Sequence, residues 1–460
     1  MDETAPQVES LYAKQEKIHA REVQGPYQRL RKGAAWTLLA IYYLLPWISW
    51  EGRQAVLFDL PARKFYIFSV TLWPQDFYLL SWLLIMAALL LFLSTSVAGR
   101  VWCGYACPQT VWTEAFVWLE RITEGNFSQR RKLDKAPWGA EKLLRKGSKR
   151  ILWFVFAAWT GFTFVGYFSP IQELGSRLVS FQLGPWETFW VCFYSLATYG
   201  NAGHLREQVC KYMCPYARFQ SAMFDRNTLI VSYDPGRGEP RGSRKRNADP
   251  KSLGLGDCID CNICVQVCPT GIDIREGLQY ECITCAACID GCDSVMEKMG
   301  YPKGLIRYTT QNALDGKGIH VFRPRTLIYS ALLTVLFGVF LFALFNRDPL
   351  TLDVIRDRNA IYRELADGRI ENVYTLKLLN KADAPHAFAL SVEGLPGVSL
   401  ETEPSDIRLD PGSLSSVIAR VRVPRDAASP GGHDLLFRAE RTGAEPAEVT
   451  RESRFMLPLN

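Results

Sequence analysis

Cysteine is the residue type that points most directly to chemistry, because 13 cysteines lie among the 460 residues and eight of them form two repeats. Residues 258–269 read Cys-x2-Cys-x2-Cys-x3-Cys-Pro, and residues 282–292 repeat the cysteine spacing. Two such quartets are the pattern in which the fourth cysteine of each quartet ligates the cluster of the other. The spacing predicts two 4Fe–4S clusters, one held by Cys258, Cys261, Cys264 and Cys292 and the other by Cys282, Cys285, Cys288 and Cys268.

Structural zinc is the alternative for these quartets, since paired Cys-x2-Cys motifs also bind zinc. Zinc sites rarely use three successive cysteines at this spacing followed by x3-Cys-Pro, which favours iron and sulfur. Asp293 stands where the second quartet would have its proline, which changes a turn and removes no ligand. The insert over about 250–300 has too few apolar residues to fold without its metal.

Two further cysteine pairs form a repeat of their own. Cys103-x3-Cys107-Pro108 and Cys210-x3-Cys214-Pro215 each follow an apolar stretch. In a continuous helix the i, i+4 spacing would place both sulfurs of a pair on one face. The proline could instead start a new helix. Either way, the repeat predicts that four thiols converge at the inner membrane surface.

Three interpretations of these four thiols are open: inert buried cysteines, a structural zinc site, or a redox-active thiol or copper site. Soft thiolates select Cu(I) among the available ions, so such a site would draw electrons onto copper, and neighbouring iron–sulfur clusters would supply them. Cys192 is expected to serve helix packing. The weaker copper candidates are His204, Met213, Met223, His386 and His433.

Apolar stretches must position these cysteines. Five stretches without Lys or Arg are predicted to span a membrane: 34–50, 77–96, 151–169, 187–203 and 327–346. The stretch 187–203 contains Glu187, and a buried core helix is its alternative.

The basic residues predict the orientation. Lys and Arg number 6 in residues 1–33, 11 in 97–150 and 17 in 204–326, against 3 in 51–76 and 1 in 170–186. The positive-inside rule places the three segments that are rich in Lys and Arg in the cytoplasm. Twelve cysteines then lie on the cytoplasmic side, as expected of reduced thiols. No cleavable signal peptide is expected, because the first apolar run starts only near Ala34.

The remaining segments are predicted to be structural. Residues 111–122 suit an interfacial helix, and 235–251 a Gly-, Pro- and Arg-rich linker that meets lipid or solvent and no nucleic acid. Residues 370–460 contain short alternating strands and no cysteine, as in a β-sandwich of immunoglobulin type. The sandwich is expected to serve docking or assembly.

The predicted fold is therefore a membrane α-helical protein with five spans, a cytoplasmic two-cluster ferredoxin-like insert and a C-terminal all-β immunoglobulin-like sandwich. Its expected parts are a cytoplasmic tail (1–33), four spans with a cytoplasmic loop (34–203, loop 97–150), a cytoplasmic region with the insert (204–326), a fifth span (327–346) and a periplasmic domain (347–460).

With the quartets, the two Cys-x3-Cys-Pro pairs, five spans and a sandwich in place, the chain resembles the CcoG family of cytochrome c oxidase accessory proteins, also called FixG or RdxA, over essentially its full length. The resemblance implies a multi-pass protein of the bacterial inner membrane that reduces Cu(II) to Cu(I) for assembly of cbb3-type oxidase. Copper would be its substrate, and its two 4Fe–4S clusters its cofactors. By position, the candidate copper or redox site is Cys103, Cys107, Cys210 and Cys214.

The resemblance also implies partners: the lipid bilayer, a cytoplasmic electron donor, and copper chaperones or oxidase assembly factors. Two other functions remain open. One is a quinol-linked electron-transfer module, as in the related membrane ferredoxins of the NapH type. The other is a non-enzymatic assembly scaffold, in which clusters and thiols are structural.

Overall fold

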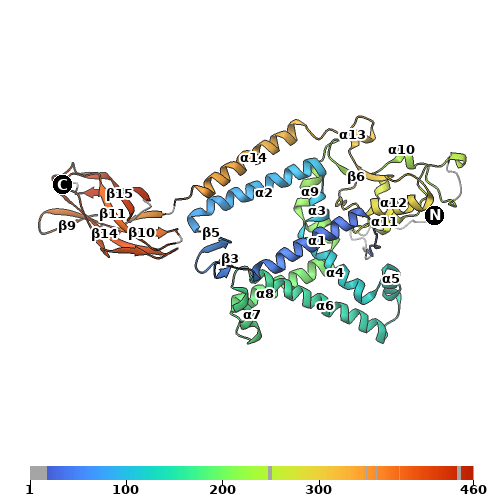
Figure 1. The fold of residues 1–460 in the computed structure, drawn as a ribbon, viewed down its shortest axis with the longest axis horizontal. Helices are drawn as coiled ribbons and strands as arrows, with labels where there is room; N and C mark the ends of the chain where they lie inside the picture. Colours follow the sequence, from blue (N-terminus) through green and yellow to red (C-terminus); the bar gives the residue numbers. More distant parts are fainter. Residues whose placement is uncertain are drawn as a thin grey trace, which may run out of the picture. The chain divides into compact units, whose positions relative to one another are not determined.

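The computed structural model describes residues 18–246, 251–348, 350–358, 360–382, 384–442 and 447–458. The predicted tail 1–33 and linker 235–251 thus lie partly outside the described residues. The chain divides into two compact units, Met1–Phe340 and Leu341–Asn460. The first unit is mainly helical and the second is all-β (Figure 1).

Each of the five stretches predicted to span a membrane contains a helix. These helices are α1 (Pro26–Leu44), α2 (Phe77–Ala98), α6 (Ala140–Val165), α8 (Pro185–Thr198) and α14 (Pro324–Phe345).

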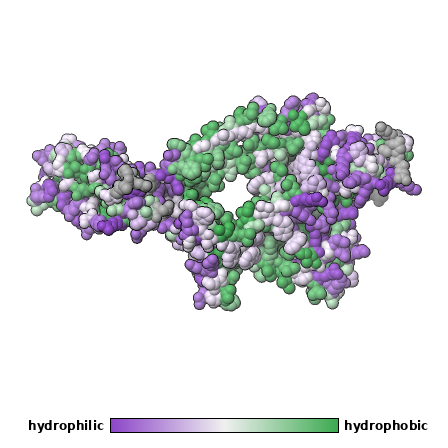
Figure 2. Space-filling view, viewed as in Figure 1, coloured by the Kyte–Doolittle hydropathy of each residue, from purple (hydrophilic) through white to green (hydrophobic). Residues whose placement is uncertain are grey.

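Two of the five helices are long and apolar enough to cross a membrane, namely the helical segments Pro74–Ala98 and Pro324–Phe345. Hydrophobic surface runs along both α2 and α14 in Figure 2, which agrees with side chains such as Leu84 and Phe342 being mostly exposed. Crossing by α1, α6 and α8 stays a prediction.

Short elements fill the connection between α1 and α2, where the sequence analysis predicted none. Two of them pair as a hairpin and three form an antiparallel sheet. They are a 3-10 turn (Leu45–Trp47), β1 (Ser49–Trp50), β2 (Arg53–Gln54), β3 (Val56–Asp59), β4 (Lys64–Ile67), β5 (Val70–Leu72) and a second 3-10 turn (Pro74–Asp76).

Short helices surround the two cysteine pairs. The helix predicted over 111–122 lies inside α4, and α7 (Ile171–Val179) connects α6 with α8. The others are α3 (Val101–Tyr105), α4 (Pro108–Glu124), α5 (Phe127–Lys135), the π-helical turns η3 (Tyr199–Leu205) and η4 (Val209–Met213), and α9 (Pro215–Ala222).

The cysteine-rich insert is closed by a two-stranded antiparallel sheet of β6 (Ile230–Tyr233) and β7 (Ile306–Thr309). Pairing of these strands brings the two ends of the insert together, although more than 70 residues separate them in the chain. Between and after them lie α10 (Pro235–Gly238), a 3-10 turn (Lys251–Leu253), α11 (Ile263–Gln266), a 3-10 turn (Ile274–Glu276), α12 (Ala287–Met299) and α13 (Gln311–Leu314).

The C-terminal unit is a sandwich of two antiparallel sheets, as predicted, but its first strand begins at Leu350 and not near residue 370. One sheet has the order β12-β14-β10-β8 with β9 paired to β10, and the other the order β13-β11-β15-β16. The strands are β8 (Leu350–Arg356), β9 (Arg363–Glu364), β10 (Arg369–Asn380), β11 (His386–Glu393), β12 (Ser399–Glu403), β13 (Ile407–Leu409), β14 (Leu414–Pro424), β15 (Gly431–Thr442) and β16 (Glu448–Leu457).

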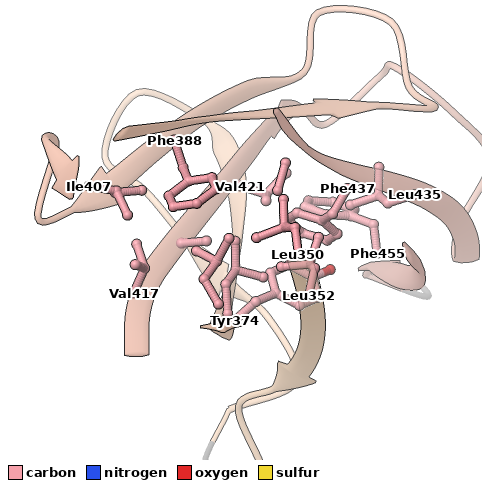
Figure 3. Close-up of a cluster of buried hydrophobic side chains, with 14 of the residues drawn as sticks. Leu350, Leu352, Tyr374, Phe388, Ile407, Val417, Val421, Leu435, Phe437 and Phe455 are labelled. Carbon is pink, nitrogen blue, oxygen red and sulfur yellow. The ribbon is translucent and has the colours of Figure 1, made fainter. Parts of the chain in front are cut away.

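Alternating side chains from both sheets form the core of the sandwich (Figure 3). Val417, Ala419 and Val421 on β14 are fully buried, while Ile418 and Arg420 between them are not. Tyr374 packs against Phe437 of the opposite sheet, with ring centroids 5.0 Å apart. The period of two that predicted the strands is thus the period with which the core is filled.

Candidate functional site

The two cysteine quartets fold into loops with the same backbone course. In each loop, the residues on both sides of the middle cysteine adopt left-handed φ angles: Asp260 and Asn262 in the first, Thr284 and Ala286 in the second. Non-glycine residues pay about 1–2 kcal/mol for this conformation, so the fold must impose it. Repeated reversal of the backbone wraps each loop around a small space.

Each loop borders a cavity lined by four cysteines of the expected grouping. One cavity is lined by Cys258, Cys261, Cys264 and Cys292. The other is lined by Cys268, Cys282, Cys285 and Cys288, and Cys264 also reaches it. Cys292 and Cys268 thus each lie with the other quartet, in the groups that the predicted crossed ligation requires.

Buried thiols in these cavities fit an iron–sulfur cluster chemically. Burial raises the pKa of Cys282 and of Cys292 to about 12 and that of Cys264 to about 11. A cluster binds the thiolate, and its iron supplies the positive charge that a buried thiolate lacks. Among the described residues, no group of three or more His, Cys, Asp or Glu side chains is arranged to hold a single metal ion.

A compensated arginine lies beside the first cavity. Arg275 lines it with a side chain that is only 7% exposed. Its guanidinium bonds Asp273 at 2.6 Å and Asp260 at 2.5 Å, so two carboxylates surround one cation.

The two Cys-x3-Cys-Pro pairs have matching local structures. Cys107 is the N-cap of α4 and Cys214 the N-cap of α9, and in each case the following proline is the first residue of the helix. Proline fits there because the first helical N–H needs no partner within the helix. The alternative in which proline starts a new helix is therefore confirmed, and neither pair lies on one continuous helix.

The four thiols of these pairs influence one another's pKa, although among the described residues they form no group arranged to hold a single metal ion. Burial, together with the charges of Cys107, Cys103 and Cys214, raises the pKa of Cys210 to about 12. Burial likewise raises the pKa of Cys103 to about 11, with added contributions from Cys107 and Cys214. The two pairs are therefore close enough to interact electrostatically.

A hydrogen-bond chain holds the buried thiol of Cys103. Its Sγ donates to Oε1 of Gln220 at 3.0 Å, and Nε2 of Gln220 donates to Oγ1 of Thr95 at 3.1 Å. Gln220 and Thr95 are both fully buried. The hydrogen bonds tie α3 to the end of α2 and to α9, whose N-cap is Cys214 of the second pair.

The thiol site adjoins the second quartet. A Cβ on Gly104 would lie 2.7 Å from the carbonyl oxygen of Ile283 and 3.0 Å from Cα of Cys285, so the two backbones are in direct contact. Cys103 also belongs to the same buried cluster as Ile283 and Cys285. The contact joins residues about 180 positions apart and links α3 to the cavity of the second quartet.

The weaker candidates lie elsewhere. His204 contacts the rings of Trp153 and Tyr199, with centroids 6.0 and 5.2 Å apart, and Cys192 is exposed on α8. The side chain of Met213 is 58% exposed. His386 bonds Arg441, His433 bonds the carbonyl of Ser429, and the carbonyl of Met223 accepts a bond from Arg325.

Two groups of residues escaped the sequence analysis. The first group is Arg100 and Gly104, which lie three residues before and one residue after Cys103. Their closeness to this cysteine in the sequence was the signal that could have marked them as functional. The second group is a buried ion-pair network on α4. Glu120 has no exposed surface and pairs with Arg206 at 2.9 Å and with Arg130 and Lys149 at 3.4 Å. No sequence signal distinguishes these residues from charges on a solvated face.

Three segments match known protein families. Residues 205–311 match the family described as a 4Fe–4S dicluster domain, and residues 78–125 match a 4Fe–4S binding domain. Residues 340–458 match the family described as the IG-like fold at the C-terminal of FixG. Iron–sulfur binding and the immunoglobulin-like sandwich are thus confirmed. Together with the two apolar helices, they define the class as a membrane-associated iron–sulfur oxidoreductase.

Similar proteins cover nearly the whole chain. Nitrogen fixation protein FixG of Rhizobium meliloti is 41% identical over 97% of this chain and 94% of its own. RdxB of Cereibacter sphaeroides is 41% identical over 95% of this chain and 93% of its own length. RdxA of the same organism is 39% identical over 95% of this chain and 96% of its own length. The chain belongs to the FixG/RdxA family, to which CcoG also belongs.

Proposed function

We propose that this protein is a cupric reductase: it passes electrons from cytoplasmic 4Fe–4S clusters to copper and reduces Cu(II) to Cu(I) for assembly of cbb3-type cytochrome c oxidase. The observation that carries the proposal is the contact of the thiol site with the second quartet, in which Gly104 lies against the backbone of Ile283 and Cys285. A redox site for a soft ion beside a buried cluster loop is the arrangement that an electron relay needs.

In this proposal each cavity holds one cluster. The first takes Cys258, Cys261, Cys264 and Cys292, and the second takes Cys282, Cys285, Cys288 and Cys268. When bound, the clusters supply electrons one at a time. The cavities lie inside the insert and are lined mostly by apolar groups and thiols; Cys258, Cys264, Cys285 and Cys292 are buried, whereas Cys261 is exposed.

The remaining four thiols receive the copper substrate. Cys103, Cys107, Cys210 and Cys214 favour Cu(I) over Cu(II), because thiolate is a soft ligand. One electron reduces one Cu(II) ion to Cu(I), and the protonated thiols release their protons as they bind the metal as thiolates. Burial raises the pKa of Cys103 to about 11, so this thiol is protonated at neutral pH until a metal displaces the proton.

The proposed topology is that of the sequence analysis. Five spans place residues 97–150 and 204–326 in the cytoplasm and the sandwich in the periplasm, and the clusters then face a cytoplasmic electron donor. Copper chaperones or oxidase assembly factors are the proposed partners of the protein. The apolar lengths of α2 and α14 support two of these spans.

A second candidate concerns the four outer thiols alone. Residues 78–125, which match a 4Fe–4S binding domain, contain only two cysteines, Cys103 and Cys107. With Cys210 and Cys214 they would supply the four thiolates of a third cluster. Iron content separates the candidates, since two clusters contain about eight iron atoms and three contain about twelve.

The deciding experiment is a single-turnover reaction. Purified protein is reduced with dithionite, freed of excess reductant and mixed anaerobically with Cu(II), while cluster absorbance and Cu(I) are followed. We expect the clusters to reoxidise as Cu(I) forms. Cluster reoxidation by a quinone analogue and not by Cu(II) would instead identify a quinol-linked electron-transfer module. If neither oxidant reoxidises the clusters, the remaining function is the non-enzymatic assembly scaffold.

Cysteine variants locate the copper site. The double variant Cys103→Ser, Cys210→Ser should lose copper reduction and keep about eight iron atoms per chain. Cys192→Ser is the matched control, because Cys192 is exposed on α8 and outside both cysteine pairs, and it should behave as the unmodified protein. Copper reduction by the double variant would refute the assignment, and a fall from about twelve iron atoms to about eight would favour the third cluster.

A further inference from the structure

Arg100 occupies the junction between the thiol site and the second quartet. Gly99 ends α2 with a left-handed φ of 55°, and this turn directs the chain into α3 with Arg100 as its N-cap. Arg100 is only 2% exposed. Its Nη1 donates a hydrogen bond to the carbonyl oxygen of Tyr280, two residues before Cys282. The turn therefore buries a full positive charge beside the second cavity.

No carboxylate among the described residues pairs with Arg100, and its buried Nε has no hydrogen-bond partner there. A buried guanidinium without a counter-ion is costly unless something negative lies nearby. A cubane with four thiolate ligands is such a group, because four thiolates outweigh the charge of its iron–sulfur core. The buried charge of Arg100, which no carboxylate among the described residues offsets, thus points to an anionic group at this junction.

Among the described residues, the first cavity has no cation that is both as deeply buried as Arg100 and without a carboxylate: Arg244, whose Nη1 donates to the carbonyl oxygen of Cys258, is partly exposed. The arginine that lines this cavity, Arg275, bonds both Asp260 and Asp273, so the local charge is not positive. Arg31, which bonds the Cys285 thiol in the second cavity, is likewise offset by Glu114 at 3.1 Å. Arg100 is more deeply buried than Arg244, so its charge is screened less by solvent and makes the surroundings of the two cavities electrostatically different.

We propose that Arg100 is a positioning residue for electron transfer: its buried charge raises the reduction potential of the cluster at the second quartet above that of the first. Reduction adds one negative charge to a cluster, and a nearby buried cation stabilises that charge. An electron that enters at the first quartet is then drawn to the second, next to the thiols. This inference rests on the cluster positions of the proposed function.

The test is an anaerobic redox titration followed by electron paramagnetic resonance, without copper. The unmodified protein should show two midpoint potentials. Arg100→Gln and Arg100→Met should lower the upper one, while Arg100→Lys, which keeps the charge, should largely restore it. Arg218→Gln is the matched control: Arg218 lies exposed on α9, where solvent screens its charge, and neither potential should move.

Arg275→Gln shows which potential belongs to the cluster at the first quartet. Loss of the Arg275 cation leaves the negative charges of Asp260 and Asp273 unbalanced, which should decrease the lower of the two midpoint potentials. The inference is overturned if Arg100→Gln and Arg100→Met load their iron and leave both potentials unchanged, or if they shift the potential that Arg275→Gln shifts. It is also overturned if neither neutral variant loads iron while Arg100→Lys does, because Arg100 then serves assembly alone.

Copper is absent from the titration, so its outcome does not depend on cupric reductase activity. The expected shift together with a failure of copper reduction would refute the proposed function alone. Copper reduction with unchanged potentials would refute only the role of Arg100.

Discussion

Substitution of Gly104 by alanine tests the contact between the thiol site and the second quartet. Gly104 lies in α3, and helix propensity alone favours alanine over glycine by about 1 kcal/mol. The structure predicts the opposite sign. The new Cβ would lie 2.7 Å from the carbonyl oxygen of Ile283, where ordinary contact begins at 3.4 Å.

The size of the effect follows from this overlap. The two backbones would have to separate by about 0.7 Å, and neither is a flexible side chain that can rotate away. Overpacking of this kind costs about 1–3 kcal/mol. We therefore expect Gly104→Ala to lower the free energy of unfolding by about 1–3 kcal/mol. It should also slow electron transfer to copper, because displacement of α3 moves Cys103 away from the second quartet.

Gly147→Ala is the matched control, since Gly147 lies inside α6 and an added Cβ would meet nothing within 4 Å. No steric overlap offsets the helix propensity of alanine at this position, so Gly147→Ala should stabilise the protein by about 1 kcal/mol. Thermal unfolding of both proteins is followed by loss of cluster absorbance, and their single-turnover copper reduction is compared. The contact is refuted if Gly104→Ala is as stable as Gly147→Ala and reduces copper at the unmodified rate.

Two further predictions concern parts of the chain away from the thiols. Glu120→Gln should lower stability by about 3–5 kcal/mol, because it leaves buried cations such as Arg206 without their counter-charge; an unchanged thermal midpoint would show that the network is not buried as described. Phe437→Ala empties the fully buried core of the sandwich and should cost about 3–5 kcal/mol in the calorimetric transition of that unit, with iron content unchanged. Loss of iron in Phe437→Ala would contradict the division of the chain into two units.

Patterns confined to short segments were readable from the sequence. Cysteine spacing predicted iron–sulfur binding because three thiolates at x2 spacing must come from one short loop. The apolar stretches predicted a helix in each of five places, and the alternating strands predicted the sandwich. Strands of two to four residues between α1 and α2 were missed, because so few residues carry no detectable period.

Burial of charge was the second omission. The sequence of α4 gave Glu120 the appearance of a residue on a polar helix face. Its burial depends on Arg130, Lys149 and Arg206, which come from three other segments. Whether a charge is solvated or paired is a property of what packs against it, and that information is absent from the local pattern.

The sequence by itself determined the chemistry of this protein: which cysteines form quartets, which form pairs, and which stretches are apolar enough for a membrane or a core. Only the tertiary structure decided what those cysteines face. It placed Gly104 against Cys285 and buried Arg100 beside Tyr280, across about 180 residues of chain. Ligand spacing and periodicity are local properties, whereas the path of an electron depends on contacts between distant segments, which only folding creates.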